Sequence, residues 1–144
     1  MGLDMYLTAK RFFWYNEKEI QKKLQDIMNV DDYEVDYIEL QVGYWRKANQ
    51  IHKWFVDNIQ NGVDDCGKHQ VEKEKLIDLL NIVNQALETN KPEKILPTQS
   101  GFFFGSTEYD EYYKKDLEDT KKMIEKYLEF KDNDKYDLYY QSSW

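Results

Sequence analysis

At 144 residues, the chain is long enough for one domain with a hydrophobic core and too short to expect two. A hydrophobic content of 41% and a charged content of 33% exclude a fully disordered chain. The net charge of −8 argues against a general nucleic-acid binder, because affinity for phosphate backbones comes chiefly from clustered Lys and Arg. The sequence has one cysteine, no leader-like N-terminus and no apolar run of membrane-spanning length. We therefore expect a cytoplasmic protein without an internal disulfide or a membrane anchor.

The first thirty residues predict a strand and a helix. Residues 3–8 alternate between apolar and polar side chains, which is typical of a strand. Residues 9–15 end in four consecutive rings and fit either a continuation of that strand or a loop over the core. A helix is predicted over residues 17–28, with Asn16 as its cap and acidic residues in its first turn.

A second strand and a second helix follow directly. Alternation resumes over residues 33–44, and its parity changes between positions 37 and 38, which indicates a bulge there or a kink near Asp36. The strand then leads into a helix predicted to begin near residue 45 and to end near Gln60. The Asn61-Gly62 pair supplies a left-handed stop for this helix.

The second half of the chain predicts two more helices and a last strand. Leucines at helical spacing mark a helix over residues 71–89. Another helix is predicted to start at Thr107 and to end before Lys131. Residues 136–141 alternate weakly and are predicted to form a final strand beside the first or the second one. We therefore expect residues 1–144 to form a single α+β domain, a small and mostly antiparallel sheet covered by about four helices.

The richest stretch for function lies at residues 43–55. It holds two tryptophans, a histidine, an amide and Arg46, which is one of only two arginines in the chain. In a helix, Trp45, Asn49 and His52 would share one stripe beside an apolar stripe that can enter the core. A ring, a guanidinium, an amide and an imidazole are the groups that hold a planar, charged ligand. Alternatively, the tryptophans anchor the core and His52 is a satisfied interior residue.

A second candidate is the glycine-flanked run of three phenylalanines at residues 101–105. It leads through Ser106 to the expected start of a helix, where exposed backbone N–H groups favour an anion. The spacing of a Walker loop is missing, so nucleotide hydrolysis by that route is not supported. Glu108 and Asp110 compete with an anion for the same helix dipole. The alternative is a capped helix preceded by a hydrophobic plug.

Metal binding and nucleophilic catalysis have weaker support in the sequence. Cys66 and His69, with His52 and an aspartate, could hold zinc, but a second pair of soft ligands is missing and an ordinary acidic turn explains the same residues. Cys66 beside a histidine also fits the inventory of a nucleophilic site, although no catalytic signature surrounds it. We therefore expect no metal, no cofactor and no catalytic residue, and a binding protein is favoured over an enzyme.

Three segments of the chain stand out together: MGLDMYL at residues 1–7, YWRKANQIHKWFV at residues 44–56 and LPTQSGFFFGSTEYD at residues 96–110. They resemble segments of a group of short, uncharacterised proteins encoded by phages and prophages. The resemblance spans the expected domain and carries no catalytic residues over to this chain. It implies an accessory protein in the cytoplasm of an infected bacterium that counters host defence. Such a protein either sequesters a nucleotide signal or occupies a defence protein.

Together, the residues and the resemblance predict a protein that binds and sequesters a small, anionic, nucleotide-derived ligand without turnover. The predicted ligand-binding residues are Tyr6, Trp45, Arg46, Asn49, His52, Phe103, Ser106 and Tyr109. Arg46 and the Ser106 turn would hold anionic oxygens. Trp45 or Phe103 would stack on a base, and the amide and the imidazole would fix its orientation. The alternative is an acidic interaction inhibitor that docks on a basic host defence protein.

Overall fold

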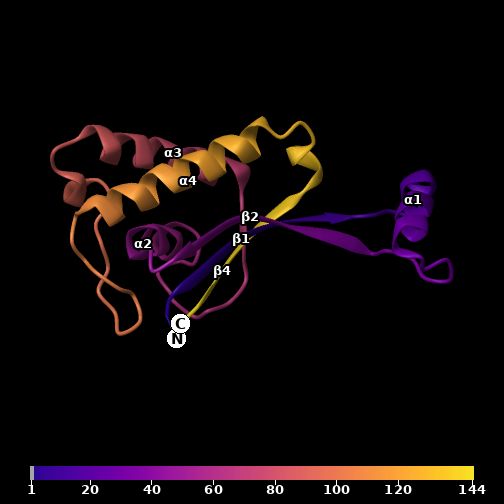
Figure 1. Cartoon of the computed structure of the whole chain (residues 1–144), viewed down its shortest axis with the longest axis horizontal. Coiled ribbons are helices and arrows are strands. Elements are labelled where there is room, and N and C mark those ends of the chain that lie inside the picture. Colours follow the sequence, from indigo (N-terminus) through magenta and orange to yellow (C-terminus); the bar gives the residue numbers. More distant parts are fainter. Residues whose placement is uncertain (1) are drawn as a thin grey trace.

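An antiparallel sheet organises the chain, which a computed structural model describes over residues 2–144. Its strands within these residues are β1 (Asp4–Phe12), β2 (Tyr37–Arg46), β3 (His69–Val71) and β4 (Asp137–Ser143), in the order β2-β1-β4-β3. The first and last strands are therefore central neighbours, which places the two ends of the chain side by side (Figure 1). The expected α+β fold with a small antiparallel sheet is confirmed, and the final strand lies beside the first.

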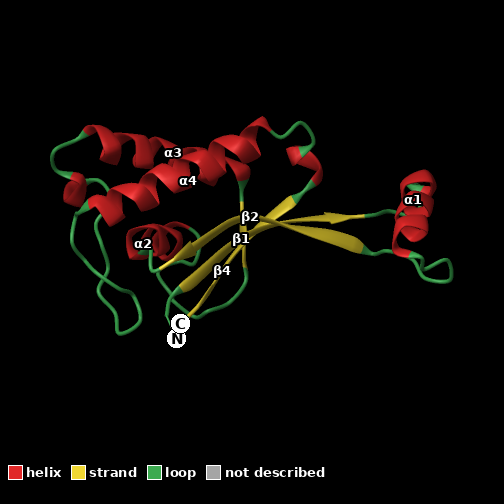
Figure 2. Ribbon diagram, viewed as in Figure 1, coloured by secondary structure: helices red, strands yellow, loops and turns green. Residues whose placement is uncertain are grey.

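Helices cover one face of this sheet. Over residues 2–144 the α-helices are α1 (Lys18–Met28), α2 (Asn49–Asn58), α3 (Lys73–Glu88) and α4 (Glu111–Glu129), with short 3-10 turns at Pro92–Lys94 and Asn133–Lys135. Figure 2 shows α3 and α4 side by side, with α2 between them and one end of the sheet. The exception is α1, which stands apart at the tip of the β1–β2 hairpin.

The core lies between the sheet and α2, α3 and α4. Met5, Leu7 and Ala9 alternate along β1 and are fully buried, whereas the residues between them point to the open face and are only partly buried. The ring of Phe55 on α2 stacks on Tyr140 of β4, with centroids 3.9 Å apart and planes only 6° from parallel. This aromatic stack fixes α2 to the middle of the sheet.

The helix expected to begin at residue 45 starts later. Trp45 belongs to β2, which pairs with β1 as far as Arg46 opposite Asp4. The chain then turns at Lys47, whose φ is 59°, and α2 begins at Asn49. Trp45 therefore points into the core from a strand. The sequence alone is compatible with a helix at Trp45, because its spacing to Asn49 is helical. The pairing of Trp45 with Met5 of β1 shows that it belongs to a strand.

The bulge in β2 lies near its end and not at the predicted position between residues 37 and 38. Leu7 pairs with Gly43 and Thr8 with Gln41, so Val42 is the extra residue.

The strand β2 also starts at Tyr37 rather than at residue 33. Two glutamines of α1 take the backbone groups that a longer strand would use. Gln21 exchanges hydrogen bonds of 2.7 and 2.9 Å with Val35, and Gln25 donates to the Tyr33 carbonyl at 2.7 Å.

The helices α1 and α4 begin later than predicted, because other residues than expected precede their first turns. The carboxylate of Glu17 accepts from the Trp14 amide at 3.0 Å and pairs with Arg11 at 2.9 Å, and α1 begins after it without a cap from Asn16. α4 begins at Glu111 and not at Thr107, because the Asp110 side chain accepts from two amides of the first turn, both at 3.1 Å. The three-residue strand β3 was not predicted, since it is too short to show alternation. The Asn61-Gly62 stop is confirmed, with φ of 54° and 77°.

The part of the chain that the structure describes contains no helix with the length and apolar character needed to cross a bilayer.

A buried hydrogen bond that ties β2 to α4 gives a first prediction. The Trp45 Nε1–H donates to the Thr120 hydroxyl at 2.7 Å, and both side chains are buried. Thr120→Val removes the acceptor and leaves the indole N–H unsatisfied, which we expect to lower the free energy of unfolding by about 1–3 kcal/mol. Urea denaturation measures the change. Thr120→Ser keeps the hydroxyl and serves as the control, and a valine variant as stable as the serine variant would contradict the importance of this bond.

Candidate ligand-binding site

The corner between β2 and α2 places two cations at the surface. Arg46 ends the strand, and Lys47 follows it in the left-handed region, with its amide donating to the Leu3 carbonyl at 2.7 Å. Gly105 faces this corner with φ of 81°, and a Cβ on it would lie 3.0 Å from the Lys47 Cβ. Only glycine combines that backbone conformation with so close an approach. The loop of residues 98–110 therefore packs directly against the corner.

The Asn49 side chain holds this loop in place. Its amide nitrogen donates to the carbonyls of Phe104 at 2.9 Å and Ser106 at 2.8 Å, and its oxygen accepts from the Gln99 amide at 2.9 Å. The side chain is 1% exposed, so these bonds form away from solvent. Asn49 thus works as a structural clamp between α2 and the loop and has little capacity left for a ligand.

A polar cavity of about 260 Å³ lies between the corner, the loop and the start of α4. Its lining residues are Arg46, Lys47, Gln50, Thr98, Gly105, Ser106, Glu108, Asp110, Tyr112, Tyr113 and Asp116. Within residues 2–144, neither Arg46 nor Lys47 forms an ion pair. Both cations are therefore available to an anionic group, and the carboxylates to groups that donate hydrogen bonds.

Asp116 is the most perturbed acid of this cavity. Burial raises the pKa of its carboxyl from 3.8 to about 6. The Gln50 amide donates to it at 3.3 Å and lowers that pKa in part, while Asp119 and Asp110 raise it further. Such a carboxyl is ionised at neutral pH and is an acceptor for N–H groups in a partly desolvated place.

His52 belongs to a separate buried network. Its Nδ1 lies 2.6 Å from the Tyr140 hydroxyl and its Nε2 lies 2.8 Å from Asp64, which also accepts from the Trp144 indole at 3.0 Å. Tyr140 is fully buried, and burial raises the pKa of its hydroxyl well above the ordinary value. That hydroxyl is inaccessible as a nucleophile. The arrangement matches the satisfied interior histidine of the alternative interpretation, and it joins α2, β4 and the loop before β3.

The hypothetical zinc set is divided between two places. His69 pairs with Asp65 at 2.8 Å, whereas His52 pairs with Asp64. Throughout residues 2–144, no group of three or more His, Cys, Asp or Glu side chains is placed to hold a metal ion. Cys66 is partly buried in the same loop, where its carbonyl accepts from the Gln141 amide at 3.2 Å.

Three other predicted site residues lie away from the polar cavity. Trp45 is 4% exposed and packs against Phe55 in the core. Tyr6 lies on the open face of the sheet beside Tyr44, with ring centroids 5.4 Å apart. Phe103 packs partly buried against the core, and its carbonyl accepts from the Leu3 amide at 3.0 Å. These rings are therefore not placed to stack on a ligand held by Arg46.

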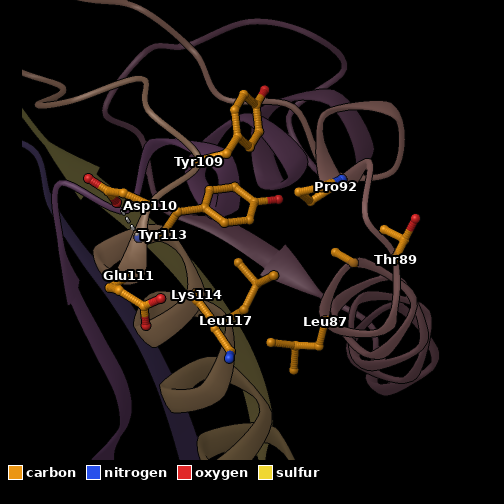
Figure 3. A pocket seen from close by; sticks show the side chains of 10 residues that line it. Leu87, Thr89, Pro92, Tyr109, Asp110, Glu111, Tyr113, Lys114 and Leu117 are labelled. Carbon is orange, nitrogen blue, oxygen red and sulfur yellow. Dashed lines mark hydrogen bonds between the residues drawn. The ribbon is translucent and has the colours of Figure 1, made fainter.

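Tyr109 borders a neighbouring cavity between the end of α3 and the start of α4. This cavity also measures about 260 Å³. Figure 3 shows the Tyr113 ring pointing toward Pro92, with Tyr109 beside it; their ring centroids are 4.9 Å apart. The Tyr113 hydroxyl donates to the Leu96 carbonyl at 2.7 Å, and burial raises the pKa of that hydroxyl. Tyr113 lines both cavities, but of the eight predicted residues only Arg46 and Ser106 line the polar one.

Sequence reasoning missed most of the residues that line the polar cavity, among them Lys47, Gln50, Tyr112 and Asp116. Lys47 and Gln50 are adjacent to the predicted residues Arg46 and Asn49. The run of polar residues after Trp45 could therefore have indicated them. Tyr112 and Asp116 lie one turn apart on α4. Nothing in their local sequence distinguishes them from the other tyrosines and acids of an acidic, tyrosine-rich chain.

Comparisons of this chain with protein-family models, with curated proteins and with solved structures found no match.

Removal of the Asn49 clamp gives the second prediction. Asn49→Ala leaves the Gln99 amide and the carbonyls of Phe104 and Ser106 without partners. We expect a loss of about 2–4 kcal/mol of stability and faster amide hydrogen exchange in residues 98–106. Hydrogen exchange followed by mass spectrometry measures both effects. Asn81→Ala, at an exposed position of α3, is the control, and equal exchange in the two variants would show that the loop does not depend on Asn49.

Asp116 gives a pH-dependent prediction. Because its folded pKa of about 6 lies above the ordinary 3.8, the folded state binds this proton more tightly than the unfolded chain does. Its destabilising effect is therefore absent below about pH 4 and complete above about pH 6. Asp116→Asn should raise the free energy of unfolding by roughly 1–2 kcal/mol at pH 7, allowing for partial solvent exposure, and by little at pH 4.

Urea denaturation at the two pH values measures this difference. Glu118→Gln, at an exposed site of the same helix, is the control and should show no such contrast. Equal effects of Asp116→Asn at pH 4 and pH 7 would contradict the raised pKa.

Proposed function

We propose that the chain binds a small, nucleotide-derived ligand in the polar cavity beside Asn49 and holds it without turnover. The observation that carries the proposal is the arrangement of two cations outside any ion pair of residues 2–144, three acids and an exposed ring around one cavity. Arg46 and Lys47 bind phosphate oxygens. Tyr112, which is 80% exposed, supplies a stacking face for the base.

The remaining polar groups select for hydrogen-bond donors on the base. The Asp116 carboxylate accepts from N–H groups at neutral pH, and the buried Gln50 holds it by one hydrogen bond. Opposite charges on the two sides of a cavity favour a ligand with an anionic end and a donor-rich end, which a nucleotide provides. At about 260 Å³ the cavity is slightly smaller than common ligand sites of about 300–1,000 Å³, so a mononucleotide would remain partly exposed.

The placement of the histidines supports binding rather than turnover. Imidazole is the side chain best suited to proton transfer near neutral pH. His52 and His69 both lie outside the polar cavity, each against its own aspartate. In the phage setting that the sequence resemblance implies, tight binding without turnover would remove a nucleotide signal from the host. Anti-defence activity in the infected cell is part of this proposal.

Calorimetric titration with AMP and GMP, with their parent nucleosides and with inorganic phosphate tests the proposal. We expect the nucleotides to bind more tightly than the nucleosides. Arg46→Ala and Lys47→Ala should each weaken nucleotide binding about tenfold or more, because each removes a charge-assisted contact. Lys18→Ala on α1 removes an exposed lysine far from the cavity and should leave the affinity unchanged.

Two results would count against this site. Unchanged nucleotide affinity in the Arg46 and Lys47 variants would place the ligand elsewhere. Failure of both nucleotides to bind the wild-type chain would remove this class of ligand from the proposal.

Exposed tyrosines and the net charge of −8 favour a second candidate, an acidic inhibitor that docks on a basic host defence protein. Tyr15, Tyr112 and Tyr33 are 91%, 80% and 73% exposed, and such rings are common anchors of protein interfaces. Under this alternative the Arg46 cavity has no role, so the nucleotide titrations separate the two functions.

A further inference from the structure

Two side-chain oxygens of the polar cavity accept no hydrogen bond from residues 2–144. One is Oδ1 of Asp116, whose other carboxylate oxygen accepts from the Gln50 side chain at 3.3 Å. The second is Oε1 of Gln50 itself, because its amide nitrogen makes both hydrogen bonds of this side chain. Both residues line the cavity. Two neighbouring side chains, joined to each other, therefore each keep an acceptor for another molecule.

The surroundings of the Gln50 amide fix which of its two ends is the nitrogen. That end lies 3.3 Å from the Asp116 carboxylate and 3.5 Å from the Tyr113 carbonyl, and both of these groups are acceptors. The opposite orientation would bring oxygens together without a hydrogen between them. The amide nitrogen therefore faces α4, and the carbonyl oxygen of the same side chain points away from these two partners.

Both free acceptors are accessible from the cavity. Gln50 is only 2% exposed, and a polar atom in such a place normally has a hydrogen-bond partner. Within residues 2–144, the completely enclosed side-chain atoms without a partner are Gln60 Oε1 and Ser142 Oγ. The free oxygens of Gln50 and Asp116 are thus not enclosed by protein atoms, and a ligand in the cavity that donates hydrogen bonds would satisfy them.

The acids around Asp116 make this part of the cavity negative. Asp119 and Asp110 both raise the pKa of the Asp116 carboxyl, so all three carboxylates act at the same place. Asp110 caps α4 with one of its oxygens, and Glu108 is an exposed acid of the same lining. Three acids against the two cations of the corner disfavour a ligand that is anionic throughout. They favour one with hydrogen-bond donors at the end remote from its phosphate.

We propose, on the basis of the nucleotide site proposed above, that the base bound in this cavity is guanine, with Asp116 and Gln50 accepting from its N1–H and its amino group. Guanine presents these donors side by side on one edge. Adenine and cytosine each present a ring acceptor beside the amino group, and uracil presents one N–H between two carbonyls. Each of these bases would bring an acceptor against an oxygen of the cavity, which costs binding energy.

The position of Tyr112 agrees with a base at this place. Tyr112 and Asp116 are four residues apart on α4, so their side chains share one face of the helix. Both residues line the cavity, and the Tyr112 side chain is 80% exposed. A base that stacks on this ring has its edge within reach of the carboxylate, while Arg46 and Lys47 at the β2–α2 corner take the phosphate.

Calorimetric titration of the full chain with GMP, IMP and AMP at neutral pH tests the identity of the base. We expect GMP to bind about tenfold or more tightly than AMP, because AMP places its N1 acceptor against the carboxylate. IMP keeps the N1–H and lacks the amino group, so its affinity should lie between the two. Equal affinities for GMP and AMP would overturn the guanine proposal and leave the nucleotide site intact, whereas failure of all three to bind would overturn both.

Asp116→Asn tests the contact between the carboxylate and the base. The new amide can donate to the O2 of xanthine, so the wild type should prefer GMP to XMP and the variant XMP to GMP. Because this substitution is expected to stabilise the fold, weaker GMP binding would not result from unfolding.

Two controls separate the base from the rest of the ligand. Ribose 5-phosphate, which has no base, should bind the variant at least as tightly as the wild type. Glu118→Gln, at an exposed position of the same helix, should keep the preference for GMP. An Asp116→Asn variant that still prefers GMP to XMP would overturn the proposal, because the carboxylate would then have no contact with the base.

Discussion

Three hydrogen bonds from the Asn49 side chain are the constraint on which the candidate site depends. They fix residues 98–106 against the start of α2, and this brings Gly105 within reach of Lys47 and places Ser106 at the cavity. Their burial makes the arrangement cooperative, since the loss of one partner leaves polar backbone groups without hydrogen bonds away from water. The cavity is therefore assembled by a residue that does not line it.

The aromatic residues divide between two structural roles. Phe55, Tyr140 and Trp45 lie in the core, where their rings pack α2 against the sheet. Trp14, Tyr15 and Tyr33 flank α1 in the sequence and are exposed, and α1 itself stands apart from the other helices (Figure 1). The 16% aromatic content therefore provides both a packed core and exposed rings.

Local periodicity was enough to predict the fold class, the strands at both ends of the chain and the positions of α1, α3 and α4 within a few residues. Trp45 was wrongly assigned to a helix, because its spacing to Asn49 and His52 is helical. Only the pairing of β2 with β1 shows that Trp45 belongs to a strand. Arg46 and Ser106 were placed in a ligand site and do line one cavity, although ligand binding itself stays a prediction. Asp116 could not be predicted, because the packing of α4 beside α2 brings it to Gln50. The clamp role of Asn49 likewise depends on carbonyls more than fifty positions away along the chain.

The most direct test of the proposed function is to identify the small molecules that copurify with the protein. The chain would be produced in bacterial cells, purified and denatured, and the released compounds would be identified by mass spectrometry. We expect about one phosphate-bearing heterocyclic compound per chain in the wild type, and its loss in a variant that combines Arg46→Ala with Lys47→Ala. A wild type that releases no such compound, or a double variant that releases the same amount, would contradict a nucleotide site at the Arg46 cavity.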